Sequence, residues 1–278
     1  MSHLPTLIEE TAQYLITQTN NWQPRFAIIL GTGLGGLVQQ VKIEYSIDYA
    51  QIPHFPVSTV ESHHGRLVFG WLGGHKVAVM QGRFHYYEGY SMQQVTFPVR
   101  VFKRLGIEKL FISNVSGSVC EDLDIGDFMI LTDHINLQPE NPLRGVNYPE
   151  LGPRFPDFSQ PYDQTLINRA LSIAQQQGIP CKTGVYASVS GPNIETKAEY
   201  IWLNRIGANA VGMSTVPEAI VAVHTGLPIF AVSIITDVGY PPHRVKSLSL
   251  EDVVAVAAQA ESKLCILMEQ LIAQEEPI

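Results

Sequence analysis

An apolar run that stops at a glycine-rich turn constrains the fold of this chain more than any other feature. Residues 26–30 read Phe-Ala-Ile-Ile-Leu, and the turn Gly31-Thr32-Gly33-Leu34-Gly35-Gly36 follows them directly. A continuous apolar run of this length is typical of a strand that is buried on both faces of a sheet. A glycine-rich turn after such a strand can present backbone N–H groups to a phosphate. The segment therefore predicts an α/β protein with a phosphate site at a strand end.

The same turn matches the G-x-G-x-x-G pattern of dinucleotide-binding proteins through Gly31, Gly33 and Gly36. That fold requires a helix of several turns after the glycines and an acidic residue about 20 residues further on. Here only residues 34–40 precede a strand-like segment, and Asp48 comes 12 residues after Gly36. We therefore expect no nicotinamide cofactor. The simplest alternative to a phosphate loop is a plain tight turn, in which the glycines serve backbone geometry alone.

Strand-like and helix-like segments alternate along the rest of the sequence. Strands are predicted at residues 67–72, 76–80, 109–114, 128–132, 183–190 and 228–236. Helices are predicted after a capping box at Thr6 and Glu9, and at residues 93–105, 165–177, 196–206, 216–224 and 250–272. This alternation predicts one α/β domain over residues 1–278, with a central mixed β-sheet flanked by helices. Residues 138–161 exceed an ordinary connection and are predicted to form a functional or interface loop.

Charge and composition narrow the class of partner. The 278-residue chain has a formal net charge of −8 that no run of Lys or Arg offsets, so no nucleic-acid partner is expected. It lacks a long apolar stretch and an N-terminal export pattern, so neither a membrane span nor secretion is expected. Its three cysteines are far apart, which favours a reducing cytoplasm. His63 and His64 have no partner at metal-ligand spacing, so no metal is expected. A small-molecule partner remains.

Three polar side chains alternate just after the predicted strand at residues 76–80. In extended backbone Arg83, His85 and Tyr87 would point to one side. A guanidinium, an imidazole and a phenol together could bind a phosphate and a sugar hydroxyl. The alternative is that they decorate a loop, but their place at a strand end favours a functional role.

Three further segments place polar groups where helices begin or strands end. Ser214 precedes the capping-box pattern Thr215-x-x-Glu218, and a helix N-terminus there would favour an anion. Glu195 precedes a second pattern, Thr196-x-x-Glu199, and Asp237 follows the predicted strand at residues 228–236. From these residues alone, a plain cap, a solvated loop acid and a turn acid remain open alternatives.

Together these segments resemble the trimeric purine nucleoside phosphorylases, from Pro24 to the last predicted helix. The matching motifs are Gly31-Thr32-Gly33-Leu34-Gly35-Gly36, His63-His64-Gly65-Arg66-Leu67, Gln81-Gly82-Arg83-Phe84-His85, Asp133-His134-Ile135-Asn136, Gly191-Pro192-Asn193-Ile194-Glu195-Thr196 and Val211-Gly212-Met213-Ser214-Thr215-Val216-Pro217-Glu218. The resemblance implies a homotrimer that cleaves purine nucleosides with orthophosphate, giving free base and ribose 1-phosphate. It implies no metal or organic cofactor, since orthophosphate is the co-substrate.

The resemblance also assigns residues to the parts of the substrates. It implies phosphate contacts from Thr32, His63, Arg83, His85, Val115 and Ser214. It implies ribose contacts from Tyr87, Met213, Leu250, His85 and, from a neighbouring subunit, Phe155. It implies purine contacts from Asn114, Ser116, Gly117, Ile194, Glu195, Val211, Gly212 and Asp237. His85, Glu195 and Asp237 are the residues it implies for catalysis.

Departures from the family pattern bear on the preferred nucleoside. Asp237 stands where many members specific for 6-oxopurines have Asn, and Leu250 stands where a His contacts the ribose 5′-hydroxyl. Both resemble methylthioadenosine phosphorylases. The segment Asn114-Val115-Ser116-Gly117-Ser118 replaces the usual Asn-Ala-Ala-Gly-Gly. Glu195 has the opposite implication, because a carboxylate suits the N1–H donor of hypoxanthine and guanine. We expect inosine and guanosine to be favoured, with methylthioadenosine or adenosine phosphorolysis as the alternative.

Overall fold

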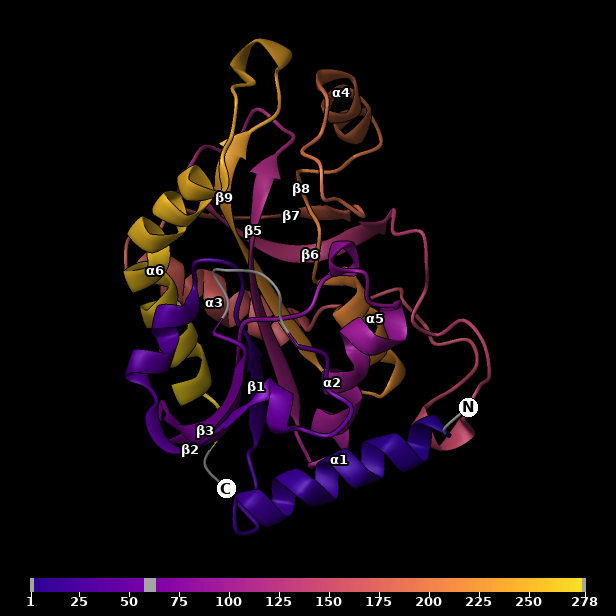
Figure 1. The fold of residues 1–278 in the computed structure, drawn as a ribbon. Helices are drawn as coiled ribbons and strands as arrows, with labels where there is room; N and C mark the ends of the chain where they lie inside the picture. Colours follow the sequence, from indigo (N-terminus) through magenta and orange to yellow (C-terminus); the bar gives the residue numbers. More distant parts are fainter. Residues whose placement is uncertain (1–2, 58–63, 277–278) are drawn as a thin grey trace.

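A single mixed sheet forms the centre of the protein in a computed structural model, which describes residues 3–57 and 64–276 (Figure 1). The strands, in chain order, are β1 (Phe26–Ile29), β2 (Lys42–Asp48), β3 (Arg66–Leu72), β4 (His75–Gln81), β5 (Lys109–Ser118), β6 (Phe128–Asn136), β7 (Cys181–Ser188), β8 (Ala210–Gly212) and β9 (Ile229–Val238). Their order across the sheet is β2-β3-β4-β1-β5-β8-β7-β6-β9, with a further pairing of β5 with β9. Strands β5, β8, β7, β6 and β9 therefore form a closed circuit at one end of the sheet.

Helices cover both sides of this sheet. They are α1 (Leu4–Gln18), α2 (Met92–Arg104), α3 (Gln164–Gln176), α4 (Lys197–Arg205), α5 (Val216–His224) and α6 (Leu250–Ala273). Helix α2 contacts both α1 and α5, whereas α3 contacts α6 on the other side (Figure 1). The predicted fold class, a single α/β domain with a mixed sheet flanked by helices, is confirmed.

Parallel pairing at the centre of the sheet positions the functional residues. Strand β1 pairs in parallel with β4 and β5, and β5 pairs in parallel with β9. These central strands are buried along most of their length, as their continuous apolar runs predicted. The carboxyl ends of β1, β5 and β9 therefore meet at one edge, where open α/β sheets bind ligands.

The local predictions were largely confirmed, with informative exceptions. The turn after β1 leads into a short 3₁₀ helix, Gly35–Gln40, and then into β2, as the argument against a dinucleotide fold required. The predicted capping box at Thr6 is wrong, because α1 begins at Leu4 and encloses both Thr6 and Glu9. The capping box at Thr196 is confirmed. Strand β8 was missed, because three residues are too few to show a periodicity.

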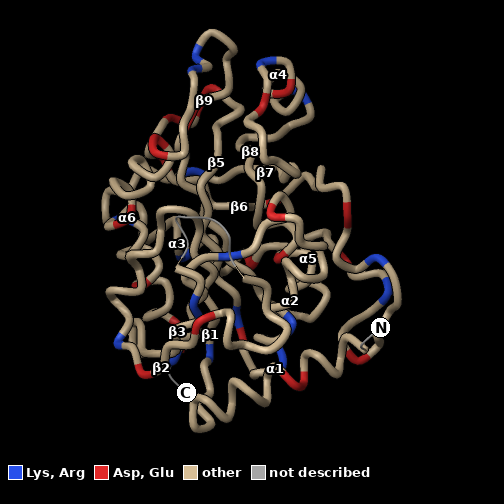
Figure 2. Tube along the Cα trace, in the orientation of Figure 1, with Lys and Arg blue, Asp and Glu red and all other residues tan. Residues whose placement is uncertain are grey.

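The long loop at residues 138–161 contains one short 3₁₀ turn, Pro149–Leu151. Its Phe155 side chain is 88% exposed, which is high for a large apolar group. Among the described residues no helix combines the length and apolar character that a membrane span needs. Charged residues of both signs are scattered along the trace (Figure 2), so attraction of an anion has to arise from local groups.

Candidate active site

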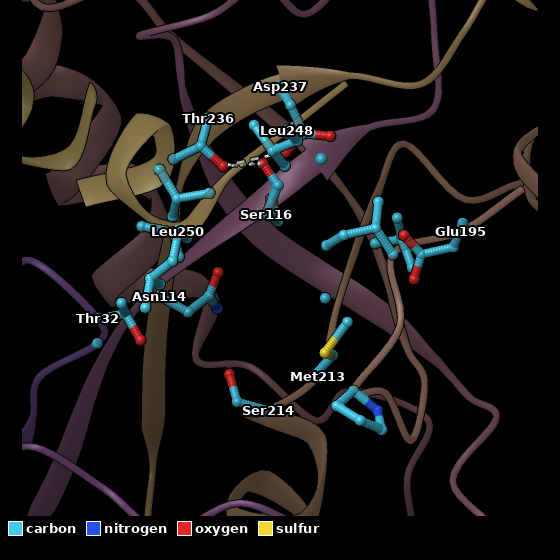
Figure 3. Close-up of a pocket in the computed structure, with 18 of the residues that line it drawn as sticks. Thr32, Asn114, Ser116, Glu195, Met213, Ser214, Thr236, Asp237, Leu248 and Leu250 are labelled. Carbon is cyan, nitrogen blue, oxygen red and sulfur yellow. Dashed lines mark hydrogen bonds between the residues drawn. The ribbon is translucent and has the colours of Figure 1, made fainter. Parts of the chain in front are cut away.

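A cavity of about 410 Å³ lies at the edge where β1, β5 and β9 end (Figure 3). Its volume is typical of sites for small organic ligands. Residues from the predicted phosphate, ribose and purine groups line it together: Thr32, Arg83, His85, Tyr87, Asn114, Val115, Ser116, Gly117, Ile194, Glu195, Val211, Gly212, Met213, Ser214, Asp237 and Leu250. Segments that are far apart in the sequence therefore meet in one site.

The glycine turn passes tightly over β5. A Cβ added to Gly31 would lie 2.8 Å from Asn114 Cα and 2.9 Å from Ser113 O, so only glycine fits there without a shift. The amides of Gly31 and Gly36 donate within the protein, to Ser113 Oγ at 3.4 Å and to Glu261 Oε1 at 2.6 Å. The expected cradle of backbone N–H groups is thus partly used to fix the turn. Thr32 supplies a side chain to the cavity.

A buried guanidinium lies next to the turn. Arg83 is 1% exposed and donates to Ser113 O and, at 3.3 Å, to Thr215 Oγ1. Its Nη1 lies 3.6 Å from Glu218 Oε1. Burial lowers the pKa of Arg83 and raises the pKa of Glu218, and each charge opposes the shift of the other. A cation held in this way can bind a phosphate strongly, because little water competes with it.

The predicted capping box at Thr215 and Glu218 is wrong. Thr215 has φ of 72°, an unusual conformation for a β-branched residue, and its hydroxyl accepts from Arg83 and, at 2.9 Å, from Asn114 Nδ2. The Glu218 carboxyl faces Arg83. The Thr215 hydroxyl is therefore engaged by Arg83 and Asn114 and does not cap α5. Ser214, whose hydroxyl lies 3.1 Å from Thr215 Oγ1, still lines the cavity beside the helix start.

Arg83, His85 and Tyr87 reach the same cavity, but through an irregular backbone. Strand β4 ends at Gln81, and a 3₁₀ turn follows at Tyr86–Glu88. The rings of His85 and Tyr87 stack with centroids 4.7 Å apart, and His85 Nδ1 lies 3.0 Å from Glu88 Oε1. Burial lowers the pKa of His85, although Glu88 opposes the shift, so the ring is neutral at pH 7. Burial raises the pKa of Tyr87 to about 12.

Two carboxyl groups occupy the other end of the cavity (Figure 3). Asp237 Oδ1 accepts from Thr236 Oγ1 at 3.1 Å, and Asp237 Oδ2 lies 3.4 Å from the Tyr200 hydroxyl. Burial raises the pKa of Asp237. Burial also raises the pKa of Glu195, and the nearby charge of Asp237 adds to that shift. The site thus has a cationic end at Arg83 and a second end where the pKa values of both carboxyls are raised.

Comparison with known proteins shows the family to which this fold belongs. Residues 25–273 match the model of the phosphorylase superfamily. Purine nucleoside phosphorylase 1 of Bacillus subtilis is 45% identical over 267 residues, 96% of this chain and 98% of that protein. The chain belongs to the purine nucleoside phosphorylase family. The purine nucleoside phosphorylase of Bos taurus is also 45% identical to this chain, over 92% of this chain and 90% of that protein.

Solved structures of the family agree. Isoform 2 of the Schistosoma mansoni purine nucleoside phosphorylase, in complex with cytosine and ribose-1-phosphate, superposes with a TM-score of 0.93 at 39% identity, covering 98% of each chain. A complex of the Schistosoma mansoni enzyme with inosine has a TM-score of 0.92 at 38% identity, with the same coverage. Among the described residues, no group of three His, Cys, Asp or Glu side chains could hold a metal ion.

Two residues that the family resemblance implied are not among those lining this cavity. His63 lies outside the described residues. Phe155 lies on the exposed long loop, and its role in a neighbouring subunit's site stays a prediction. Sequence reasoning also missed cavity residues, namely Tyr200, Thr236, Leu248 and Val253.

A β-bulge in this member of the purine nucleoside phosphorylase family explains why the sequence did not predict Thr236 as a cavity residue. In the pairing of β5 with β9, Ser116 faces Ile235 whereas Gly117 faces Asp237, so Thr236 is an extra residue. Strand alternation would have turned Thr236 away from Asp237, but the bulge brings both side chains to the cavity. Tyr200 gave no signal, because an aromatic residue in a helix normally indicates core packing.

The raised pKa of Asp237 predicts a pH-dependent stability. Between its unfolded and folded pKa values the folded protein binds more protons than the unfolded chain, so the free energy of unfolding falls as pH rises through that window. Asp237→Asn removes this contribution, and we expect a shallower fall than in the wild type. Urea unfolding from about pH 4 to about pH 8 measures it. Parallel profiles for the two proteins would contradict the assignment.

Proposed function

We propose that the protein is a purine nucleoside phosphorylase, a pentosyltransferase that cleaves the N-glycosidic bond of purine ribonucleosides and deoxyribonucleosides with orthophosphate. The products are the free base and ribose or deoxyribose 1-phosphate. The observation that carries the proposal is one cavity joining the buried guanidinium of Arg83 to the carboxyl groups of Glu195 and Asp237. Relatives with the same name support it, as do solved relatives in complex with inosine, guanosine and adenosine.

We assign orthophosphate to the Arg83 end of the cavity. Its contacts would be Thr32, His63, Arg83, His85, Ser214 and the backbone at Val115. Ribose would lie next to it, against Tyr87, Met213 and Leu250. The purine would fill the other end, against Asn114, Ser116, Gly117, Ile194, Glu195, Val211, Gly212 and Asp237. Apart from His63, all of these line the cavity.

The proposed mechanism follows from where charge develops. Breaking the glycosidic bond leaves positive charge on the sugar and negative charge on the departing purine. Phosphate held at Arg83 stabilises the first and attacks C1′. A donor at purine N7 stabilises the second. Asp237 can donate only when protonated, and the burial that raises its pKa favours that form.

The two carboxyls also bear on the choice of purine. An ionised Glu195 would accept the N1–H of hypoxanthine or guanine, whereas the N1 of adenine is itself an acceptor. We therefore propose inosine and guanosine as the main substrates, with adenosine as a weaker one. Methylthioadenosine is the less favoured alternative, because the similar relatives carry the purine nucleoside phosphorylase name.

The remaining expectations stand as parts of the proposal. We propose a cytoplasmic homotrimer in which Phe155 of one subunit contacts the sugar site of the next, and the 88% exposure of that side chain supports such a contact. We also propose that the reaction uses no metal or organic cofactor, because orthophosphate itself is the nucleophile.

An assay of base release tests the proposal. Purified protein is incubated with inosine, guanosine, adenosine or methylthioadenosine, each with and without orthophosphate. We expect hypoxanthine and guanine to be released only with phosphate, together with pentose 1-phosphate. Base release without phosphate would contradict phosphorolysis. A kcat/KM for methylthioadenosine about tenfold above that for inosine, which is about 1.4 kcal/mol, would overturn the substrate order.

A further inference from the structure

The Tyr200 hydroxyl acts on both carboxyls of the cavity. Tyr200 projects from α4 and lines the cavity with Glu195 and Asp237. Its hydroxyl lies 3.4 Å from Asp237 Oδ2, and it is close enough to Glu195 to lower the pKa of that carboxyl. Its ring packs on Gly239, where an added Cβ would lie 2.2 Å from Tyr200 Cδ1. Packing therefore fixes the ring, while the hydroxyl can donate to the carboxyl of either Glu195 or Asp237.

The Tyr200 hydroxyl has only one hydrogen to donate to the two carboxyls. A phenol has one hydrogen and can donate to one carboxylate at a time. Burial and the neighbouring acids raise the pKa of Tyr200, so the phenol stays neutral. Its hydrogen bonds lower the pKa values of Glu195 and Asp237, against the burial that raises both. Exposed Glu199 adds a small charge effect on Glu195. Two partly buried acids near one donor are expected to hold one proton between them.

Thr236 allows Asp237 to be either acid or carboxylate. Thr236 Oγ1 lies 3.1 Å from Asp237 Oδ1 and 3.3 Å from Ser116 O. It can donate to an ionised Asp237. Alternatively, it can turn its hydrogen to the Ser116 carbonyl and accept from a protonated Asp237. The surrounding hydrogen bonds thus tolerate the proton on Asp237, as a donor to the purine requires.

We propose that Tyr200 is a specificity-determining positioning residue whose hydroxyl keeps one of the two carboxyls ionised and thereby selects 6-oxopurines. This inference rests on the proposed function. With the proton on Asp237, Tyr200 donates to Glu195, and the Glu195 carboxylate accepts the purine N1–H. A 6-aminopurine instead requires a protonated Glu195 that donates to N1. Passing from the first state to the second takes up one proton from solvent onto Glu195, and no other bond changes.

Tyr200→Phe tests this role, because it removes the hydroxyl and keeps the ring. Glu195 then loses its donor and is more readily protonated. We expect the ratio of kcat/KM for adenosine to that for inosine to rise about tenfold near pH 7, the effect of one pKa unit. The acidic limb of the inosine kcat/KM profile should move to higher pH. Tyr162→Phe is the matched control, since that buried hydroxyl contacts His134 Nδ1 at 3.1 Å, and both readouts should stay at wild-type values.

An equal loss for both nucleosides with an unmoved acidic limb would overturn the proposal. Calorimetry with hypoxanthine and adenine separates it from the proposed function, because base binding does not require turnover. If the wild type fails to cleave inosine but Tyr200→Phe shifts base binding toward adenine, the proposed function is wrong and the role of Tyr200 stands. If the two bases bind in the same ratio to both proteins, or bind to neither, the role of Tyr200 is wrong.

Discussion

Replacing Arg83 with methionine is expected to lower the free energy of unfolding by about 3–5 kcal/mol, because it leaves a buried carboxyl without its cation. The side chains of Arg83 and Glu218 are only 2% and 3% exposed, so water screens this pair weakly. The variant should also lower kcat/KM for phosphate about 10²–10⁴-fold, since two charge-assisted hydrogen bonds contribute about 1.5–3 kcal/mol each. Urea unfolding and the phosphate dependence of inosine cleavage measure the two effects.

A second substitution separates stability from phosphate binding. Adding Glu218→Leu to Arg83→Met replaces both charges with apolar groups, so most of the lost stability should return while phosphate use stays impaired. Arg100→Met is a matched control, because Arg100 is also buried but faces His224 Nδ1, at 3.4 Å, rather than a carboxylate. Equal destabilisation by the two Arg→Met changes, without recovery in the double variant, would contradict the role assigned to the pair.

The fold was predictable because its signals are local. The apolar run at residues 26–30 and the similar runs in β5 and β9 predicted buried strands, and a closely packed sheet confirmed them. Capping depends on what else is nearby. Thr196 and Glu199 cap α4 as their spacing predicted, whereas Thr215 and Glu218, with the same spacing, contact a buried guanidinium. The residues next to Thr215 in the sequence do not predict this contact, because Arg83 lies 132 residues away along the chain.

The site was predictable where motifs coincide with strand ends, and not where tertiary structure alone creates it. Arg83, Glu195 and Asp237 follow or precede recognisable elements, and they line one cavity. Thr236 reaches that cavity through a bulge, and Tyr200 through the packing of its ring on Gly239. Neither the bulge nor the ring packing can be predicted from a local sequence pattern. Two of the residues that sequence reasoning missed, Thr236 and Tyr200, therefore lie beside Asp237, an acid that it found.

Replacing Glu195 with alanine is expected to lower kcat/KM for inosine about 10²-fold, because the N1–H of a 6-oxopurine loses a charged acceptor worth about 1.5–3 kcal/mol. Adenosine should lose far less, since its N1 would no longer face a carboxylate. The ratio of kcat/KM for inosine to that for adenosine, measured at saturating phosphate, reports the change. The KM for phosphate should stay close to the wild-type value, because Glu195 lies away from Thr32 and Ser214, two of the residues assigned to phosphate (Figure 3).

Glu199→Gln serves as the control for this substitution. Glu199 is four residues from Glu195, exposed, and engaged with the backbone N–H of Thr196, a contact that glutamine can keep. It removes a nearby negative charge without altering the cavity wall, so the nucleoside preference should stay as in the wild type. A similar loss for inosine and adenosine in Glu195→Ala would mean that the residue supports the cavity wall instead of reading the purine edge. The proposed preference for inosine and guanosine would then lose its basis, because that preference was argued from Glu195.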